Sequence, residues 1–363
     1  MLLADLLLSG PPLSTPLAPV PTVDDLSAVF PFNSERVPRG LCQKIAIVSP
    51  NLVVGWSGSY NTARDVISEL QRRVVAKRYT ADTLQRDLND LLPPHDAENS
   101  IGLLGFIRDP DNRISYWGRN YYPVKTRVFG KVGLLGSGLA DIEKFLTQND
   151  RVPHAEYNVQ INVLEQSVGF GLFMSGALLR IEAERAASLA QFYGGGYEIA
   201  VSERGEFKKV DEVLYAFWSV DVDVEAKRMG GNFLPSRVFR YSYKDDLLRI
   251  RSVSFVRSGK TTSAREQMFF VPPIYRDLLS HERADKSKPD LNTRWLCNYF
   301  LVRYSDGRSE IFARIDYQPK EKKWIRFEDL AQGIGAHVSH QFLEEVGRQI
   351  LQPADGPQQE RQN

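Results

Sequence analysis

The stretch QKIAIVSPNLVVGWSGSYNTARDVISEL, Gln43–Leu70, is the most informative part of the sequence. Two apolar runs, IAIV and LVVGW, are separated by the turn-forming residues SPN, so this pattern predicts a β-hairpin. The second run ends in Ser57-Gly58-Ser59, after which apolar residues recur at helical spacing. The stretch therefore predicts a strand that leads directly into a helix, with Lys44 at the start of the hairpin.

A second segment has the same form. An apolar strand expected at Val132–Leu135 ends in the small residues 136–138 (GSG), before a helix expected at Leu139–Leu146. Such turns can direct backbone N–H groups toward a shared space, where a helix N-terminus also favours negative charge. Small residues also allow a strand and a helix to pack closely, so the pattern by itself is open to a purely structural interpretation.

The rest of the chain divides by its hydrophobic pattern. A long helix is expected from about Val159 to Phe192, and three glycines then lead into a strand. Beyond residue 225 the pattern changes to alternating strands with charged outer faces, and a terminal helix is expected at Phe327–Leu351. We therefore expect a first domain at 1–225, a β-rich extension at 226–351 and a disordered polar tail at 352–363.

Four segments in the first domain carry a resemblance to a known family. They are LLADLLLS, QKIAIV, NLVVGWSGSYNTARDVISEL and VGLLGSGLADIEKFL, in this order. In order and spacing they resemble the proteasome β-subunit type of N-terminal-nucleophile hydrolase, including its bacterial proteasome-like members. The resemblance implies an α+β fold, a four-layer αββα sandwich, here followed by the β-rich C-terminal extension.

The resemblance also implies a set of site residues. In the family, a Thr, Ser or Cys at the processed N-terminus attacks an amide carbonyl, with its own α-amine as the base. Lys44 corresponds to the lysine that lowers the pKa of the nucleophile, and Asp5 to the aspartate that holds this lysine. Gly58 corresponds to the donor of the oxyanion N–H, and Ser137 to a supporting serine. An active protein of this kind would be a threonine-type peptidase or amidohydrolase with a peptide or amide substrate.

The sequence departs from the family at the nucleophile. Only MLLA precedes Asp5, so no residue of the given chain occupies the place of the nucleophile, and the first strand of the family fold is missing. Thr15 and Thr22 lie in a proline-rich loop, and cleavage before Thr22 would remove Asp5. Either a longer native start supplies the nucleophile, or the protein is an inactive proteasome-like scaffold or binding subunit. A third interpretation places the function in residues 225–363 as a binding module.

Composition excludes several other classes. The chain has 363 residues and a net charge of +1, which indicates neither nucleic-acid binding nor a membrane-attached basic arm. With only Cys42 and Cys297, the sequence predicts no disulfide framework and a cytoplasmic location. His337 and His340 lack the pattern of a zinc motif, so no metal and no cofactor are expected. By the resemblance, a homo-oligomer assembled through helix packing is expected.

Overall fold

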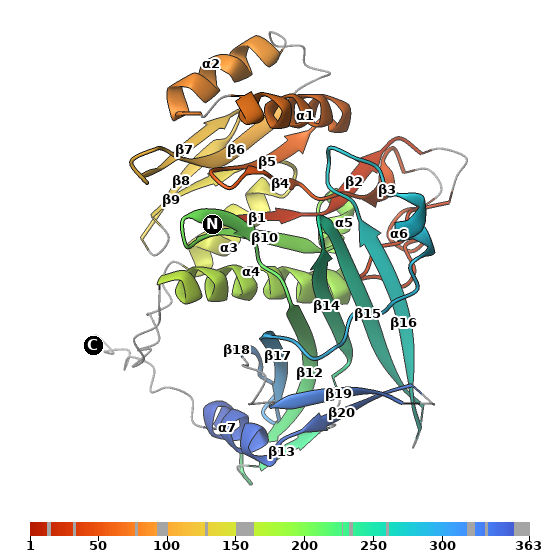
Figure 1. Cartoon of the computed structure of the whole chain (residues 1–363). Helices are drawn as coiled ribbons and strands as arrows, with labels where there is room; N and C mark the ends of the chain where they lie inside the picture. The colour runs from red at the N-terminus through yellow and green to blue at the C-terminus, as the bar shows by residue number, and fades with distance from the viewer. Residues whose placement is uncertain are drawn as a thin grey trace. The chain divides into compact units, whose positions relative to one another are not determined.

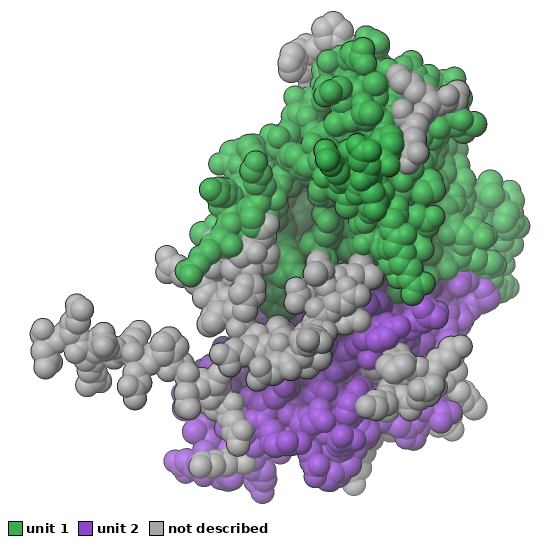
Figure 2. Space-filling model, turned by 60° about the vertical axis from the view of Figure 1, so that its left-hand side comes forward, with its two compact units in different colours: residues 1–211, 243–248, 269–286 green, residues 212–242, 249–268, 287–363 purple. Residues whose placement is uncertain are grey.

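The computed structural model describes residues 1–12, 16–31, 34–76, 79–92, 101–127, 130–149, 163–226, 228–231, 235–258, 261–317, 324–330 and 333–351. The chain forms two compact units, which Figure 2 shows in different colours. Unit 1 consists of residues 1–211, 243–248 and 269–286, and unit 2 of residues 212–242, 249–268 and 287–363. Neither unit is a continuous piece of sequence. The predicted tail at 352–363 and the candidate Thr15 lie outside the described residues.

The predicted hairpin is present in unit 1 as the start of a four-stranded antiparallel sheet. The sheet has the order β4-β5-β6-β7, formed by Ile45–Ser49, Leu52–Gly58, Ile101–Arg108 and Ile114–Arg119. The central strands β5 and β6 are buried along most of their length, as expected for strands with apolar residues on both faces. Gly105 lies opposite Val54 in this region, and a side chain at Gly105 would overlap the Val53 carbonyl oxygen.

Two helices cover one face of this sheet (Figure 1). Helix α1 spans Tyr60–Ala76 and α2 spans Ala81–Leu91. The Ser59 hydroxyl accepts from Thr62 N (3.4 Å) and so caps α1, while Thr80 and Thr83 form a capping box at α2. Their buried leucine, isoleucine and valine side chains form one core with the inner residues of β5 and β6. This apolar face explains why the segment after the Ser-Gly-Ser turn is helical.

The opposite face of the sheet packs on a second, three-stranded sheet. Its order is β1-β10-β11, formed by Leu2–Asp5, Tyr197–Glu203 and Glu206–Lys209. Leu2, Ile45, Leu104 and Phe207 share the core between the two sheets. The remaining helices and strands of this part are β2 (Leu7–Gly10), β3 (Val37–Leu41), β8 (Tyr122–Thr126), β9 (Gly130–Leu134), α3 (Leu139–Asn149), α4 (Val163–Arg185) and α5 (Ala187–Ala190).

The expected long helix at 159–192 is interrupted in the structure. Helix α4 ends at Arg185, and Ala186 adopts a left-handed conformation (φ 51°) before the single turn of α5. A left-handed residue cannot continue an α-helix, so the helix ends there. The prediction was correct in type for α4 but wrong beyond Arg185, and residues 159–162 lie outside the described part of the chain.

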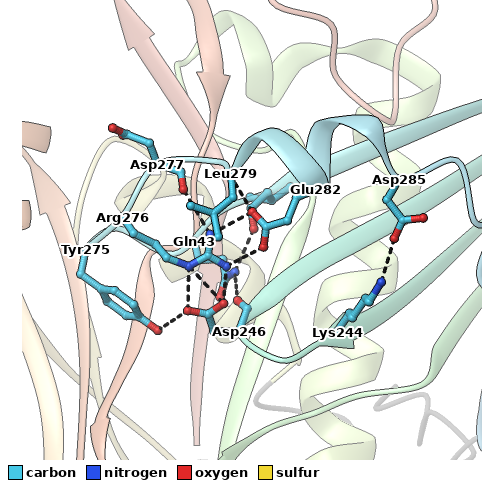
Figure 3. Close-up of polar contacts among 10 residues, drawn as sticks. Gln43, Lys244, Asp246, Tyr275, Arg276, Asp277, Leu279, Glu282 and Asp285 are labelled. Atoms are coloured by element: carbon cyan, nitrogen blue, oxygen red, sulfur yellow. Dashed lines mark hydrogen bonds and ion pairs between the residues drawn. The ribbon is translucent and has the colours of Figure 1, made fainter.

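Two segments from the second half of the sequence belong to unit 1. Residues 243–248 are the ends of two adjacent strands with the turn between them, and residues 269–286 include the short helix α6 (Ser280–Ala284). Arg276 joins them, because its guanidinium binds Asp246 (Nε to Oδ2, 3.0 Å) and Glu282 (Nη2 to Oε1, 2.8 Å), as Figure 3 shows. Tyr275 donates its hydroxyl to the same Asp246 carboxylate (3.0 Å). Gln43, which precedes Lys44, is bonded to both segments through its amide, with Nε2 donating to Asp246 O (2.7 Å) and Val271 O (2.8 Å).

Unit 2 is built on a seven-stranded sheet, of which the strand ends at 243–248 and 269–271 belong to unit 1. The strand order is β16-β15-β14-β12-β17-β18, with β13 paired to β12; the strands are β12 (Val213–Asp223), β13 (Arg228–Gly231), β14 (Arg237–Lys244), β15 (Leu247–Ser258), β16 (Thr261–Val271), β17 (Trp295–Tyr304) and β18 (Ser309–Tyr317). Helix α7 (His340–Leu351) packs on one face through Phe342, Val346 and Ile350. The rings of Phe300 and Phe342 lie 6.3 Å apart within this core.

The predicted terminal helix at Phe327–Leu351 is correct only from His340 onward. Residues 325–338 instead form a hairpin of β19 (Ile325–Leu330) and β20 (Gly333–Val338). Ile325 and Phe327 are buried and alternate with charged residues, which is the period of a strand rather than of a helix. His337 therefore lies on β20, where its imidazole is 3.3 Å from Glu328.

The fold predicted for the chain, a four-layer αββα sandwich, is wrong. The described residues are predominantly β, with twenty strands divided among six sheets and seven helices. One physical cause is visible at Leu6, whose N–H donates to the carbonyl oxygens of Gly194 and Gly196 (both 3.1 Å). This contact interrupts the apolar run 2–10, so that β1 pairs with β10 whereas β2 pairs with β3. The hydrophobic pattern alone did not predict this division into small sheets.

Candidate functional site

Asp5 and Lys44 form an ion pair in unit 1. Asp5 is the last residue of β1, Lys44 directly precedes β4, and Lys44 Nζ lies 2.7 Å from Asp5 Oδ1. The side chains are 20% and 12% exposed, respectively, so the pair is largely shielded from water. Among the described residues, Asp5 is the one side chain that the Lys44 ammonium binds. A charge pair at this depth is screened less than a surface pair, and an ammonium has three donors, so Lys44 can also bind a second acceptor.

Backbone groups fix the Asp5 carboxylate. The same oxygen, Oδ1, accepts from Leu7 N (3.0 Å) and Gly194 N (3.3 Å). The Gly194 carbonyl in turn accepts from Leu6 N (3.1 Å) and Leu7 N (3.0 Å). Residues 5–7 and the glycine turn at 194–196 therefore each donate hydrogen bonds to the other segment. These bonds orient the Asp5 carboxylate toward Lys44.

The turn that contains Gly58 lies next to Lys44 along the sheet. Trp56 N donates to Lys44 O (3.0 Å), and Gly58 ends β5 two residues further on. Gly58 has φ 94°, a conformation that strongly favours glycine, and Ser59 then caps α1. The predicted role of Gly58 as an oxyanion donor stays a prediction, but the conformation explains why glycine is needed at this position.

The second small-residue turn contacts the first. A Cβ placed on Gly136 would lie 3.3 Å from the Ser57 Cβ, so the two turns are in van der Waals contact. Ser137 Oγ donates to Phe192 O (3.0 Å), and a Cβ on Gly138 would lie 2.9 Å from the Tyr193 ring. Ser137 is thus bonded to the backbone just before the glycine turn at 194–196, and its supporting role also stays a prediction.

A buried glutamate behind the glycine turn was not identified from the sequence. Glu182, near the end of α4, is fully buried and accepts from Gly195 N (2.9 Å), Ser188 Oγ (2.8 Å) and the Thr22 hydroxyl. Burial is the main reason why the pKa of Glu182 is raised to about 7, although these hydrogen bonds oppose the shift. The segment GALLRIEAER contains four charged residues, so the sequence gives no local signal that distinguishes Glu182 from its charged neighbours.

A second buried carboxylate supports the strand that follows Lys44. Glu198 on β10 accepts from Ile45 N (2.6 Å) through Oε1 and forms an ion pair with Lys209 through Oε2. Burial raises the pKa of Glu198 and lowers the pKa of Lys209, while the attraction between them opposes both shifts. This pair therefore anchors β4 to the second sheet directly beside the Asp5–Lys44 pair.

Neither Cys42 nor Thr22 has the environment of a nucleophile. Burial raises the pKa of the Cys42 thiol to about 12, so the reactive thiolate is scarce at neutral pH. The Thr22 side chain is buried and donates to Glu182. The contacts of both side chains are therefore those of structural residues.

Comparisons with known proteins give no assignment. No protein-family model matches the chain, and no curated protein matches it. In the described ranges, no helix combines the length and apolar character needed to cross a lipid bilayer. The described residues likewise contain no group of three or more His, Cys, Asp or Glu placed to hold a metal ion. The geometry around Asp5 and Lys44 is therefore the basis for assigning a function.

Proposed function

We propose that unit 1 carries a site for amide-bond hydrolysis of the N-terminal-nucleophile type. The observation that supports this proposal is the shielded Asp5–Lys44 ion pair, with its carboxylate fixed by two backbone N–H groups and its ammonium retaining donors for a further acceptor. The contact between the Ser57–Ser59 and Gly136–Gly138 turns agrees with the arrangement that the sequence resemblance implies. The proposed substrate is a peptide or another amide, and the proposed location is the cytoplasm, since Cys42 and Cys297 are both free thiols.

The proposed reaction assigns this chain an electrostatic role. A hydroxyl or thiol at a mature N-terminus adds to the amide carbonyl, its proton passes to the α-amine, and the amine product leaves with that proton. Water then hydrolyses the resulting ester or thioester. The Lys44 ammonium stabilises the deprotonated nucleophile, Asp5 holds Lys44 in place, and the Gly58 N–H stabilises the oxyanion.

The experiment combines N-terminal sequencing of the native protein with covalent labelling. A peptide vinyl sulfone is expected to label a Thr, Ser or Cys at the mature N-terminus. Lys44→Met and Asp5→Asn are each expected to lower the labelling rate at least about 100-fold, the usual scale for loss of an activating group. Lys208→Met is the matched control, because Lys208 is exposed and lies on β11 of the same unit. A native N-terminus without such a residue, or labelling that is unchanged in Lys44→Met, would refute the proposal.

A second candidate function is a non-catalytic binding or assembly subunit. The observation that favours it is that the Lys44 ammonium has Asp5 as its one side-chain partner in the described part of the chain, with no hydroxyl or thiol bonded to it. In this case Lys44 would bind a carboxylate or carbonyl of a ligand without reaction. The expected result is no vinyl sulfone labelling, together with homo-oligomers in light scattering that persist in Lys44→Met.

A further inference from the structure

We propose that Glu182 is the positioning residue of this site, because it holds the glycine turn at 194–196 that fixes Asp5 and, through Asp5, Lys44. The inference rests on the function proposed above for the Asp5–Lys44 pair. Glu182 lies on helix α4, outside the strands that position Asp5 and Lys44.

The first link of this arrangement is the contact between Glu182 and the turn. Glu182 Oε1 accepts from Gly195 N at 2.9 Å, and a Cβ added to Gly194 would overlap Glu182 Oε2. Gly194, Gly195 and Gly196 have φ values of 115°, 69° and 119°, so the whole turn is in a conformation that disfavours other residues. A backbone of this kind has little intrinsic preference for one conformation, and the buried carboxylate supplies the partner that selects it.

The second link is the contact between the turn and β1. Gly194 N donates to Asp5 Oδ1 (3.3 Å), while the Gly194 carbonyl accepts from Leu6 N and Leu7 N. A rotation of the turn would break these three hydrogen bonds together. The Asp5 carboxylate would then lose one of the two N–H groups that aim it at Lys44.

The third element is the environment of the carboxylate itself. Thr22 and Ser188 donate to the Glu182 carboxylate and do not titrate. Among the described residues, the titratable groups that interact with Glu182 electrostatically are Asp5 and Tyr193. The negative charge of Asp5 adds to burial in raising the pKa of Glu182 to about 7. Opening the turn exposes Glu182 to water, where it ionises near its ordinary value of 4.5. By linkage, opening therefore becomes easier as the pH rises from about 4.5 to about 7, and then levels off.

The test measures hydrogen exchange at the Leu6 and Leu7 amides, corrected for the intrinsic effect of pH. In the wild type, we expect the protection factors to fall roughly 40-fold between about pH 5 and pH 7, because the slope approaches tenfold for each pH unit only well inside the interval between the two pKa values. In Glu182→Gln, whose amide keeps an acceptor for Gly195 N but does not ionise, we expect protection that does not change with pH. Glu182→Ala is expected to lower protection at least about tenfold at pH 5, from the loss of a buried acceptor.

Glu206→Gln is the matched control. Glu206 lies on β11 of the same unit, is 52% exposed and pairs with the exposed Lys208 (3.6 Å), so its substitution is expected to leave the exchange profile unchanged. The same variants are then labelled with the peptide vinyl sulfone, and Glu182→Ala is expected to be labelled at least about tenfold more slowly than Glu206→Gln.

The two proposals fail in different ways. If no form of the protein is labelled, the hydrolase proposal fails, while the exchange measurements still decide the role of Glu182. An identical pH profile in wild type and Glu182→Gln would overturn the positioning role. A folded Glu182→Ala with unchanged protection at Leu6 and Leu7 would do the same, and if Glu182→Ala does not fold, the Glu182→Gln profile is decisive.

Discussion

The buried pair of Glu198 and Lys209 allows a quantitative test of how β4 is held next to the site. We expect Lys209→Met to destabilise the protein by about 3–5 kcal/mol, because removal of one member leaves an unpaired buried charge. The Glu198 side chain is fully buried and that of Lys209 is 13% exposed, so water offers little compensation. Glu198 would retain Ile45 N at 2.6 Å and the Tyr243 hydroxyl at 3.4 Å as donors.

The double variant Glu198→Gln/Lys209→Met separates the charge from the packing. The amide that replaces the Glu198 carboxylate can still accept from Ile45 N, so the double variant is expected to lose only about 1–2 kcal/mol, roughly the net value of imperfect hydrogen bonding at a buried site. The double variant is therefore expected to be about 2–3 kcal/mol more stable than Lys209→Met. Lys208→Met, which alters the exposed neighbour on β11, is expected to change stability by less than about 0.5 kcal/mol.

The assay is urea unfolding followed by tryptophan fluorescence at several pH values. Burial raises the pKa of Glu198 in the folded state, and loss of Lys209 removes the attraction that opposes this shift. The stability of Lys209→Met relative to wild type should therefore fall as the pH rises above the ordinary glutamate value of about 4.5. The reasoning is refuted if Lys209→Met stays within about 1 kcal/mol of wild type at pH 8, or if the double variant is as unstable as the single one.

Three further substitutions test the core and the polar contacts. Gly105→Ala is expected to cost about 1–3 kcal/mol, because the methyl group would overlap the Val53 carbonyl oxygen, whereas Gly40→Ala, with open space around it, should be near neutral in the same urea titration. Arg276→Met is expected to cost about 1–3 kcal/mol at pH 7. Arg276 lowers the pKa of two carboxyl groups, so this cost should shrink as the pH falls below about 4, and a constant cost would contradict the argument. Phe342→Ala, which leaves a cavity at a buried position on α7, should cost about 3–5 kcal/mol in thermal or urea unfolding, and a loss below about 1 kcal/mol would show that α7 is not part of the core.

Local sequence patterns correctly predicted several elements near the site. The hairpin of β4 and β5 and the helix α1 follow from two short apolar runs, a turn and a capping serine. These features depend on neighbours within a few residues, so the sequence contains the necessary information. Helix α4 was predicted in type but not in length, because the left-handed Ala186 has no local sequence signal.

Other features depend on residues that are distant in the sequence. The division of the apolar run 2–10 into β1 and β2 depends on carbonyl groups at 194 and 196. The hairpin at 325–338 was predicted to be part of a helix, because the alternation of four residues is a weak signal until the segment has a strand to pair with. The four-layer sandwich was predicted wrongly for the same reason, since strand pairing between distant segments decides how many sheets form.

The sequence by itself determined where the candidate site residues lie relative to the neighbouring strands and turns. It placed Asp5 after an apolar run, Lys44 before a hairpin and Gly58 at a strand-to-helix turn, because turn chemistry and side-chain period act over short distances.

Only the tertiary structure decided which of these groups meet, and what holds them. It brought Lys44 to 2.7 Å from Asp5 and placed Glu182 behind the glycine turn that fixes Asp5. Burial at these positions lowers the local dielectric constant and so strengthens the interactions between the charged groups. This burial is produced by chain segments that are far apart in the sequence.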